Sequence, residues 1–161
     1  MEVRGFDMFR CKCCGAINRA PTSRPDGAVA KCGRCHSLLD LSAAPQSVDA
    51  AALAQTLCSS PVPVLVDFWT PQCQSEESAD RMIDRVAREH AGAVITLTLN
   101  AEAEPVPAIV HGIRRLLARD GTFGLPTLVL FKRGREVARR IGALASVELE
   151  QWLRAAVPSV P

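Results

Sequence analysis

The sequence has no long apolar run and almost no excess of charge of either sign. No stretch approaches the roughly 18 consecutive apolar residues of a membrane-spanning helix, so we do not expect a membrane protein. The 19 basic and 17 acidic residues give a net charge of +2, which offers no general attraction for nucleic acid or an acidic membrane surface. The N-terminal segment MEVRGFDMFR lacks the apolar stretch of a secretion signal. The compartment we expect is therefore the cytoplasm.

The sequence also lacks internal repeats and low-complexity tracts. Its 161 residues are enough for one medium domain with a small appendage, and its 48% content of apolar residues is enough for an ordinary core. Both observations predict a globular protein.

Cysteine, by contrast, is abundant and unevenly distributed. Five of the seven cysteines fall within the first 35 residues. An odd number concentrated in this way is a poor match to a secreted disulfide framework, and clustered cysteines in a reducing compartment more often bind a metal ion. The cluster therefore indicates a metal site near the N-terminus.

Two C-x2-C pairs, separated by 17 residues, lie in this cluster. The spacing falls in the range expected of a structural four-thiolate zinc site. The predicted zinc ligands are Cys11, Cys14, Cys32 and Cys35. We expect Cys13 to be spare and His36 to lie at the surface. Four unrelated free cysteines, or two disulfides, are the alternative.

Composition divides the chain into three parts. Residues 1–41 form a loop-rich module with seven basic and four acidic residues, a net charge of +3. Residues 42–47 are predicted to be a linker, and residues 48–158 contain most of the apolar segments. A module of ~40 residues cannot bury enough apolar surface to fold alone, so the metal would supply much of its folding free energy.

Apolar periodicity in the longer part predicts an α/β domain with a mixed sheet. An almost continuous apolar run is typical of a strand covered on both faces, and two strand-like segments around a Gly-containing loop predict a hairpin. In chain order the expected elements are a helix from its N-cap Ser47 to about Leu57, a strand over 63–68, a helix over 72–90, a strand over 93–99, a helix over 106–118, hairpin strands over 127–131 and 136–141, and a helix over 146–157.

The stretch FWTPQCQSE places a cysteine after the first of these strands and at the start of a helix. Unpaired N–H groups and the positive end of the helix dipole favour a thiolate there, so Cys73 is predicted to be a nucleophile. Glu76 and Glu77 oppose this effect, because a nearby carboxylate disfavours a second negative charge. Alternatively the stretch merely starts a helix, with Thr70 as N-cap and Pro71 as the first helical residue.

Five segments, taken in order, carry a family pattern. They are Val64–Trp69, the helix opened by Cys73, Gly124–Thr127, Phe131–Gly134 and Ile141–Ala143. Together they resemble the thioredoxin family. The cysteine-rich module before them is similar to the N-terminal extension of the thioredoxin 2 subfamily, so the resemblance spans nearly the whole chain. It implies a thioredoxin fold with a mixed sheet, preceded by a small zinc-ribbon module.

The resemblance also implies roles for individual residues. Cys73 matches the attacking cysteine of the family, whereas Glu76 occupies the position of the resolving cysteine. Asp67 matches the buried proton acceptor, and Thr98 replaces the lysine that is its counter-charge. Pro126 matches the cis-proline beside the nucleophile. The implied substrate groove further includes Trp69, Gln72, Leu125 and Gly142.

The first predicted function is thiol–disulfide exchange through a single cysteine, on protein disulfides or on glutathione mixed disulfides. Without a resolving cysteine, a mixed disulfide on Cys73 can be released only by an external thiol. Glutathione or a donor resembling thioredoxin reductase would supply that thiol. The alternative is a non-catalytic binding or chaperone module on the same fold. Nucleic-acid binding by the basic module is not favoured, because the sequence contains no platform of aromatic and basic residues.

Overall fold

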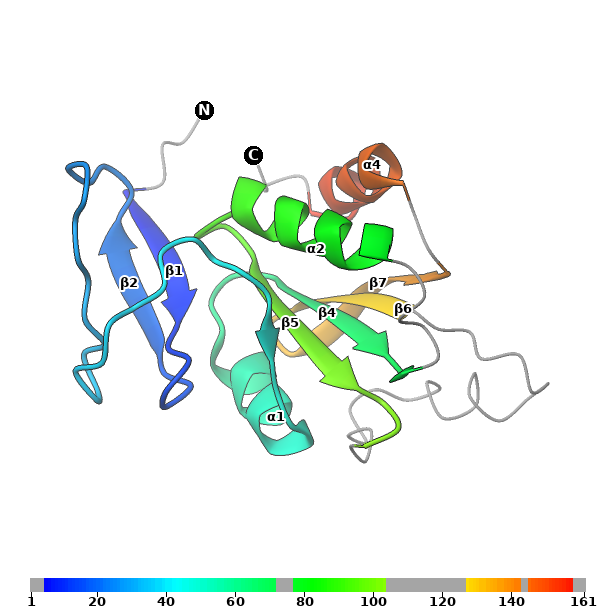
Figure 1. Ribbon diagram of the computed structural model, residues 1–161, viewed down its shortest axis with the longest axis horizontal. Coiled ribbons are helices and arrows are strands. Elements are labelled where there is room, and N and C mark those ends of the chain that lie inside the picture. Colours follow the sequence, from blue (N-terminus) through cyan, green and yellow to red (C-terminus); the bar gives the residue numbers. More distant parts are fainter. Residues whose placement is uncertain (1–4, 72–76, 104–126, 143–144, 158–161) are drawn as a thin grey trace.

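The computed structural model describes residues 5–71, 77–103, 127–142 and 145–157 (Figure 1). Within these ranges the chain forms an N-terminal two-stranded hairpin and a layered α/β part built on a five-stranded sheet. The helix expected over residues 106–118 lies outside them. None of the helices in the described ranges is long and apolar enough to cross a membrane.

The N-terminal hairpin consists of β1 (Phe6–Arg10) and β2 (Ile17–Pro21), which pair antiparallel. Phe9 and Ala20 are its buried apolar residues. The chain from residue 22 to residue 45 contains no helix, and its strand pairing is limited to an isolated bridge between Lys31 and Leu38. The hairpin and these loops provide only a small apolar core, as expected for a module of this length.

The sheet of the α/β part has the strand order β3-β5-β4-β6-β7. Its strands are β3 (Gln46–Ser47), β4 (Val64–Trp69), β5 (Ile95–Asn100), β6 (Thr127–Lys132) and β7 (Arg135–Ile141). β5 pairs parallel with β3 and β4, whereas the pairs β4–β6 and β6–β7 are antiparallel. The mixed sheet confirms the α/β prediction. Five of the six residues of central β4 are buried, which explains its apolar run.

Helices cover both faces of this sheet (Figure 1). α1 (Ala50–Ser59) lies on one face, and α2 (Glu77–Glu89) and α4 (Ser146–Ala156) lie on the other. Val66 and Phe68 of β4 belong to the core under α1, while Leu65 belongs to the core under α2 and α4. Because successive side chains of a strand alternate between faces, Asp67 shares the face of Leu65. The fold thus places this carboxyl beneath α2 and α4.

The start of the first helix differs from the prediction. Asp49, not Ser47, is the N-cap of α1, and its Oδ1 accepts a hydrogen bond from the N–H of Ala52 over 2.7 Å. Ser47 belongs instead to β3, where it pairs with β5 beside Gln46. The predicted linker therefore ends in a strand, because these two residues gain backbone hydrogen bonds at the edge of the sheet.

The predicted hairpin at the other edge of the sheet is confirmed. Its turn is shorter than expected, since only Arg133 and Gly134 separate β6 from β7. Both residues have positive φ, 51° and 73° respectively, the backbone pattern of the two-residue turns that match the twist of a hairpin.

The N-terminal hairpin packs against the α/β part near the start of β5. The N–H of Met8 donates to the carbonyl of Gly92 over 3.0 Å, and Ile17 packs against the core on the α1 face. Gly92 has a φ of +77°, and a Cβ at this position would lie 2.2 Å from the Cβ of Asp7. Both the backbone and the close approach of the hairpin therefore require glycine here.

Candidate functional site

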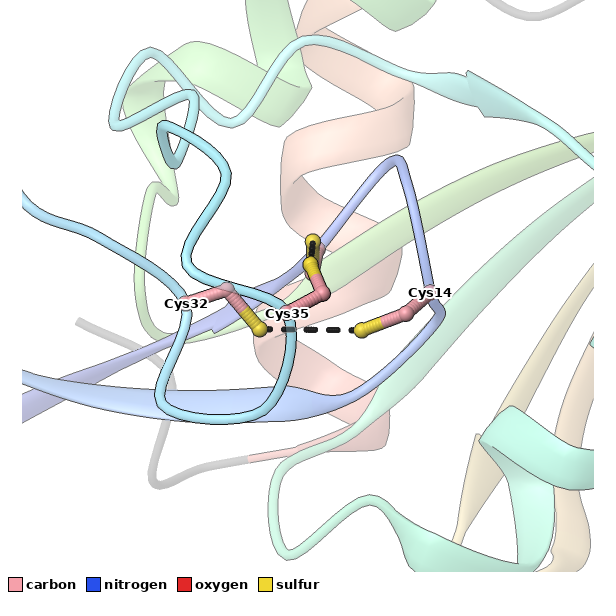
Figure 2. Close-up of side chains that lie close together, drawn as sticks. Cys14, Cys32 and Cys35 are labelled. Carbon is pink, nitrogen blue, oxygen red and sulfur yellow. Dashed lines mark hydrogen bonds between the residues drawn. The ribbon is translucent and has the colours of Figure 1, made fainter.

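The four cysteines of the two C-x2-C pairs lie together beside the end of β1. Their sulfur atoms all lie within 4.8 Å of one another. The Sγ atoms of Cys11 and Cys35 are 3.6 Å apart, and so are those of Cys14 and Cys32. Figure 2 shows the sulfurs of Cys14 and Cys32 pointing towards each other. Each close pair thus joins one cysteine of the first motif to one of the second.

These four sulfurs fit a tetrahedral metal ion. Zinc binds thiolates at about 2.3 Å, so neighbouring sulfurs of a tetrahedral site are about 3.8 Å apart, close to the 3.6 Å of the two pairs. Cys13 and His36 are exposed and do not belong to the group. The residues present can therefore hold a metal ion with four thiolate ligands.

Two similar turns present the sulfurs to one another. The N–H of Gly15 donates to the carbonyl of Cys11, and the N–H of His36 donates to the carbonyl of Cys32, both over 2.9 Å. The donors have left-handed backbone conformations, with φ of 75° at Gly15 and 62° at His36. Such a residue reverses the chain after each pair, so each motif is folded locally into a compact knuckle.

Two polar residues that the sequence did not single out, Asn18 and Ser37, contact these sulfurs. The Asn18 amide nitrogen lies 3.5 Å from the Sγ of Cys32, and its Oδ1 accepts a hydrogen bond from the N–H of Gly33. The hydroxyl of Ser37 lies 2.9 Å from the Sγ of Cys35 and 3.3 Å from that of Cys11. Such contacts orient metal ligands. The spacing of the cysteines in the sequence does not identify the residues that make them.

The thiols of the cluster differ in pKa. Backbone N–H groups, first that of Cys35 and then that of Arg34, lower the pKa of Cys32 to about 6. The Ala16 N–H lowers the pKa of Cys14, but burial and hydrogen bonds with the other thiols together outweigh this effect and raise the pKa to about 12. Neighbouring thiols cannot all ionise together without a cation among them, and a divalent metal ion is such a cation.

Asp67 occupies a second, separate environment in β4. Its side chain is only 8% exposed, and its Oδ1 has no hydrogen-bond partner among the described residues. Burial, with a further contribution from the Asp80 carboxylate on α2, raises the pKa of Asp67 to about 7. The sequence did not single out Asp80, because the contact depends on how α2 packs on the sheet. Asp67 can therefore take up or release a proton near neutral pH.

The other predicted site residues fall partly within the described ranges. Trp69 is half-buried at the end of β4. Gly142 follows β7 with a φ of +88°, and within the described part of the chain no atom outside its immediate neighbours lies within 4 Å of the position a Cβ would take. The remaining predicted site residues, Gln72, Cys73, Leu125 and Pro126, lie outside the described residues. The described part thus brings together the four cysteines, and it places Asp67 under α2.

The strand order and the helix layers define the class of protein. A mixed five-stranded sheet covered by helices on both faces, with a buried carboxyl in its central strand, is a thioredoxin-like α/β fold. A solved structure of a mutant thioredoxin from Halobacterium salinarum is similar with a TM-score of 0.56 and 20% identity, covering 76% of this chain and 98% of that one. This likeness confirms the predicted fold.

Sequence comparisons then give the family. The thioredoxin family profile matches residues 44–155. Thioredoxin C-3 from Corynebacterium nephridii is 33% identical over 143 residues, 89% of this chain and 90% of that protein. Thioredoxin 1 from Nostoc sp. is 34% identical over 113 residues, 70% of this chain and 96% of that protein. The chain belongs to the thioredoxin family.

The alignment with thioredoxin C-3 extends beyond the α/β part. Its 143 residues are more than the chain contains after residue 41, so it includes some of the cysteine-rich module. The similarity to this relative therefore involves both parts of the chain.

Proposed function

We propose that the protein carries out thiol–disulfide exchange through Cys73 alone, on protein disulfides or glutathione mixed disulfides. Membership of the thioredoxin family supports exchange chemistry in general. The restriction to one cysteine rests on the sequence, in which Glu76 stands where the resemblance implies a resolving cysteine.

The proposed reaction has two exchange steps. The Cys73 thiolate attacks a glutathione mixed disulfide at the glutathione sulfur, forms its own disulfide with glutathione and releases the protein thiolate. A second glutathione thiolate then attacks the glutathione sulfur of this intermediate, which yields oxidised glutathione and regenerates the Cys73 thiolate. A donor resembling thioredoxin reductase is the other proposed source of reducing thiols. On a protein disulfide, the Cys73 thiolate attacks one protein sulfur and releases the other as a thiolate. The external thiolate then attacks that protein sulfur, which releases the Cys73 thiolate and leaves the external thiol in a mixed disulfide with the protein.

The observation that carries this proposal within the described residues is the environment of Asp67. With a pKa of about 7, its carboxyl can accept a proton from a thiol or return one to a departing thiolate at neutral pH. Its partner on β5 is Thr98, so no lysine at that position holds the carboxyl permanently ionised. The proposed catalytic residues are Cys73, Asp67 and Pro126, and the proposed substrate groove comprises Trp69, Gln72, Leu125 and Gly142.

Trapping of the mixed disulfide tests this proposal. The protein is incubated with a glutathionylated peptide, quenched with acid and analysed by mass spectrometry, and we expect a glutathione adduct on Cys73. The matched control is Cys58→Ser, which removes an exposed thiol of α1 and should leave the adduct unchanged. Equal adduct levels in the wild type and in Cys73→Ser would contradict the proposal. Glu76→Cys should increase the reduction of protein disulfides.

The competing function, a non-catalytic binding module, gives a different set of results. It requires Cys73 to be alkylated no faster than a free thiol of ordinary reactivity, and it requires client binding to survive in Cys73→Ser. Measuring both the alkylation rate and the binding of an unfolded protein therefore separates the two functions.

We also propose that Cys11, Cys14, Cys32 and Cys35 bind one structural zinc ion. The support is the fit between the sulfur–sulfur distances and a tetrahedral thiolate site. In this role the metal would join two knuckles that are far apart in the chain, and it would supply folding free energy to a module with a small apolar core.

A further inference from the structure

Arg10, the last residue of β1, is a buried cation. Its side chain is only 8% exposed. Its Nε donates to the Oγ1 of Thr56 over 2.9 Å, and its Nη1 donates to the Oε1 of Gln46 over 2.8 Å. The Gln46 amide in turn donates to the backbone carbonyl of Arg10 over 2.9 Å. One side chain of the N-terminal module is thereby bonded to both α1 and β3 of the α/β part.

The acceptors of these bonds are neutral. Arg10 forms no ion pair with a carboxylate among the described residues. Asp49 lines the same cleft, and its negative charge favours the charged guanidinium. This carboxylate is exposed, however, and it caps the N-terminus of α1, so it offsets only part of the cost of burial. Burying a charge is unfavourable when its hydrogen-bond partners are neutral, and nearby opposite charges reduce this cost. The buried position of Arg10 is therefore favoured by a further negative partner.

The cysteine cluster lies next to this guanidinium. Arg10 directly precedes Cys11, and a Cβ on Gly15 would lie 3.1 Å from its Nη2. Gly15 closes the turn that carries both Cys11 and Cys14. A divalent metal ion with four thiolate ligands has a net charge of −2, and this charge would be held in the loop that the guanidinium packs against.

We propose that Arg10 is the counter-charge of the metal-loaded four-cysteine site and couples metal binding to the stability of the thioredoxin domain. This inference rests on the zinc site proposed above. Bound metal favours the buried position of Arg10, and the bonds from Arg10 to Thr56 and Gln46 then hold the module on α1 and β3. By thermodynamic reciprocity, the same contacts strengthen metal binding. Metal loss would therefore weaken the domain that carries Cys73.

The positions of the two tryptophans make this coupling measurable. Trp69 and Trp152 both lie outside the first 41 residues, so tryptophan fluorescence reports on unfolding of the thioredoxin domain and not of the module. Zinc content and zinc affinity are measured separately, by competition with a chromophoric chelator. The full-length chain is unfolded by urea with zinc bound and after its removal.

In the wild type we expect zinc removal to lower the urea midpoint reported by tryptophan. In Arg10→Met we expect a lower midpoint with zinc bound, little further change when zinc is removed, and a zinc affinity reduced about tenfold. Arg19→Met is the matched control. It removes an exposed positive charge from the same hairpin and should respond to zinc as the wild type does.

Two further variants address the possibility that Arg10→Met does not fold. Arg10→Lys keeps the charge but loses the fork of donors and should keep part of the zinc response, while Thr56→Val removes one acceptor and should weaken it. If zinc removal shifts the urea midpoint of Arg10→Met as much as that of the wild type, the coupling is wrong. The same holds if both Arg10→Lys and Thr56→Val show the full shift. Neither result would contradict the zinc site itself. If the wild type binds zinc but its midpoint does not respond, the coupling is likewise wrong. A wild type that binds no zinc would refute the metal site itself, and with it the coupling.

Discussion

Thr98 stands opposite Asp67 in the parallel pairing of β4 and β5. The carboxyl therefore has a hydroxyl beside it on this neighbouring strand, and the charged group that acts on it from α2 is another acid, Asp80. Burial and like charge both favour the protonated form. The stability of the fold should consequently depend on pH through Asp67.

Replacing Asp67 by Asn tests this dependence. The pKa of the carboxyl is about 7 in the folded chain, against 3.8 for an unperturbed aspartate, so ionisation is easier in the unfolded state. The wild type thus loses stability as pH rises from about 4 to about 7, and above pH 7 the whole loss persists. At pH 8 we expect Asp67→Asn to be more stable by about 2–4 kcal/mol, and the difference should nearly vanish at pH 4. Urea unfolding at both pH values is the measurement, and a difference that does not change with pH would contradict this account.

Removing one ligand should abolish the metal site. Cys32 is fully buried and is contacted by the Arg34 N–H and by Asn18, so Cys32→Ser should yield protein without bound zinc and with an unfolded module. Cys13→Ser is the matched control and should retain a full complement of zinc, because this exposed thiol lies outside the group of four. Zinc content is measured after dialysis. Equal zinc in the two variants would contradict the assignment of Cys32 as a required ligand.

Gly92→Ala should loosen the contact between the two parts of the chain. The left-handed backbone alone costs about 1–2 kcal/mol with a Cβ, and the added methyl also collides with Asp7. The control is Gly142→Ala, which has a similar φ of +88° and no contact with its Cβ position among the residues that the structure describes, and it should show only the backbone effect. Urea unfolding followed by tryptophan fluorescence compares the two variants. Equal losses of stability would show that the contact with Asp7 contributes nothing.

His90 should oppose, in mild acid, the stabilisation that protonation of Asp67 provides. This residue at the end of α2 is 5% exposed, and its Nδ1 has no hydrogen-bond partner among the described residues. Burial first, and then the Arg154 charge on α4, lower the pKa of His90, although Glu89 and Glu150 oppose the shift. The unfolded chain therefore binds a proton more readily, so stability falls as pH drops through about 6.5.

The variant His90→Gln cannot titrate in this range. Asp67 contributes equally to the two proteins, so the melting temperature of the variant minus that of the wild type should become more positive between pH 7 and pH 5. A difference that stays constant over this range would show that His90 does not contribute to the pH dependence.

Much of the fold could be predicted because it depends on local pattern. The apolar run of β4 indicates a strand buried on both faces, and the hairpin of β6 and β7 follows from apolar segments around a glycine. The two C-x2-C pairs likewise identify four sulfurs that the structure brings within 4.8 Å of one another. In each case the residues that define the feature lie close together in the chain, or repeat a short motif.

Features that depend on contacts between distant segments were not predicted. β3 consists of two residues, too few for any periodicity, and it forms only because β5 offers it a free edge. Arg10 gives no sign of burial in the sequence, since a single basic residue beside a cysteine ordinarily faces solvent. The requirement for glycine at position 92 could not be predicted either, because it arises from the approach of Asp7, which lies far away in the chain.

The placement of the N-terminal hairpin has a consequence for how the sheet meets other molecules. β3 pairs with only Leu97 and Thr98 of β5, and β1 contacts β5 as well, with Met8 bonded to Gly92 just before this strand. Uncovered strand edges can pair with another chain and begin aggregation. The cysteine-rich module therefore lies against β5, whose edge is covered by the two-residue strand β3 alone. In this position the module should hinder a strand of a second molecule from pairing with β5.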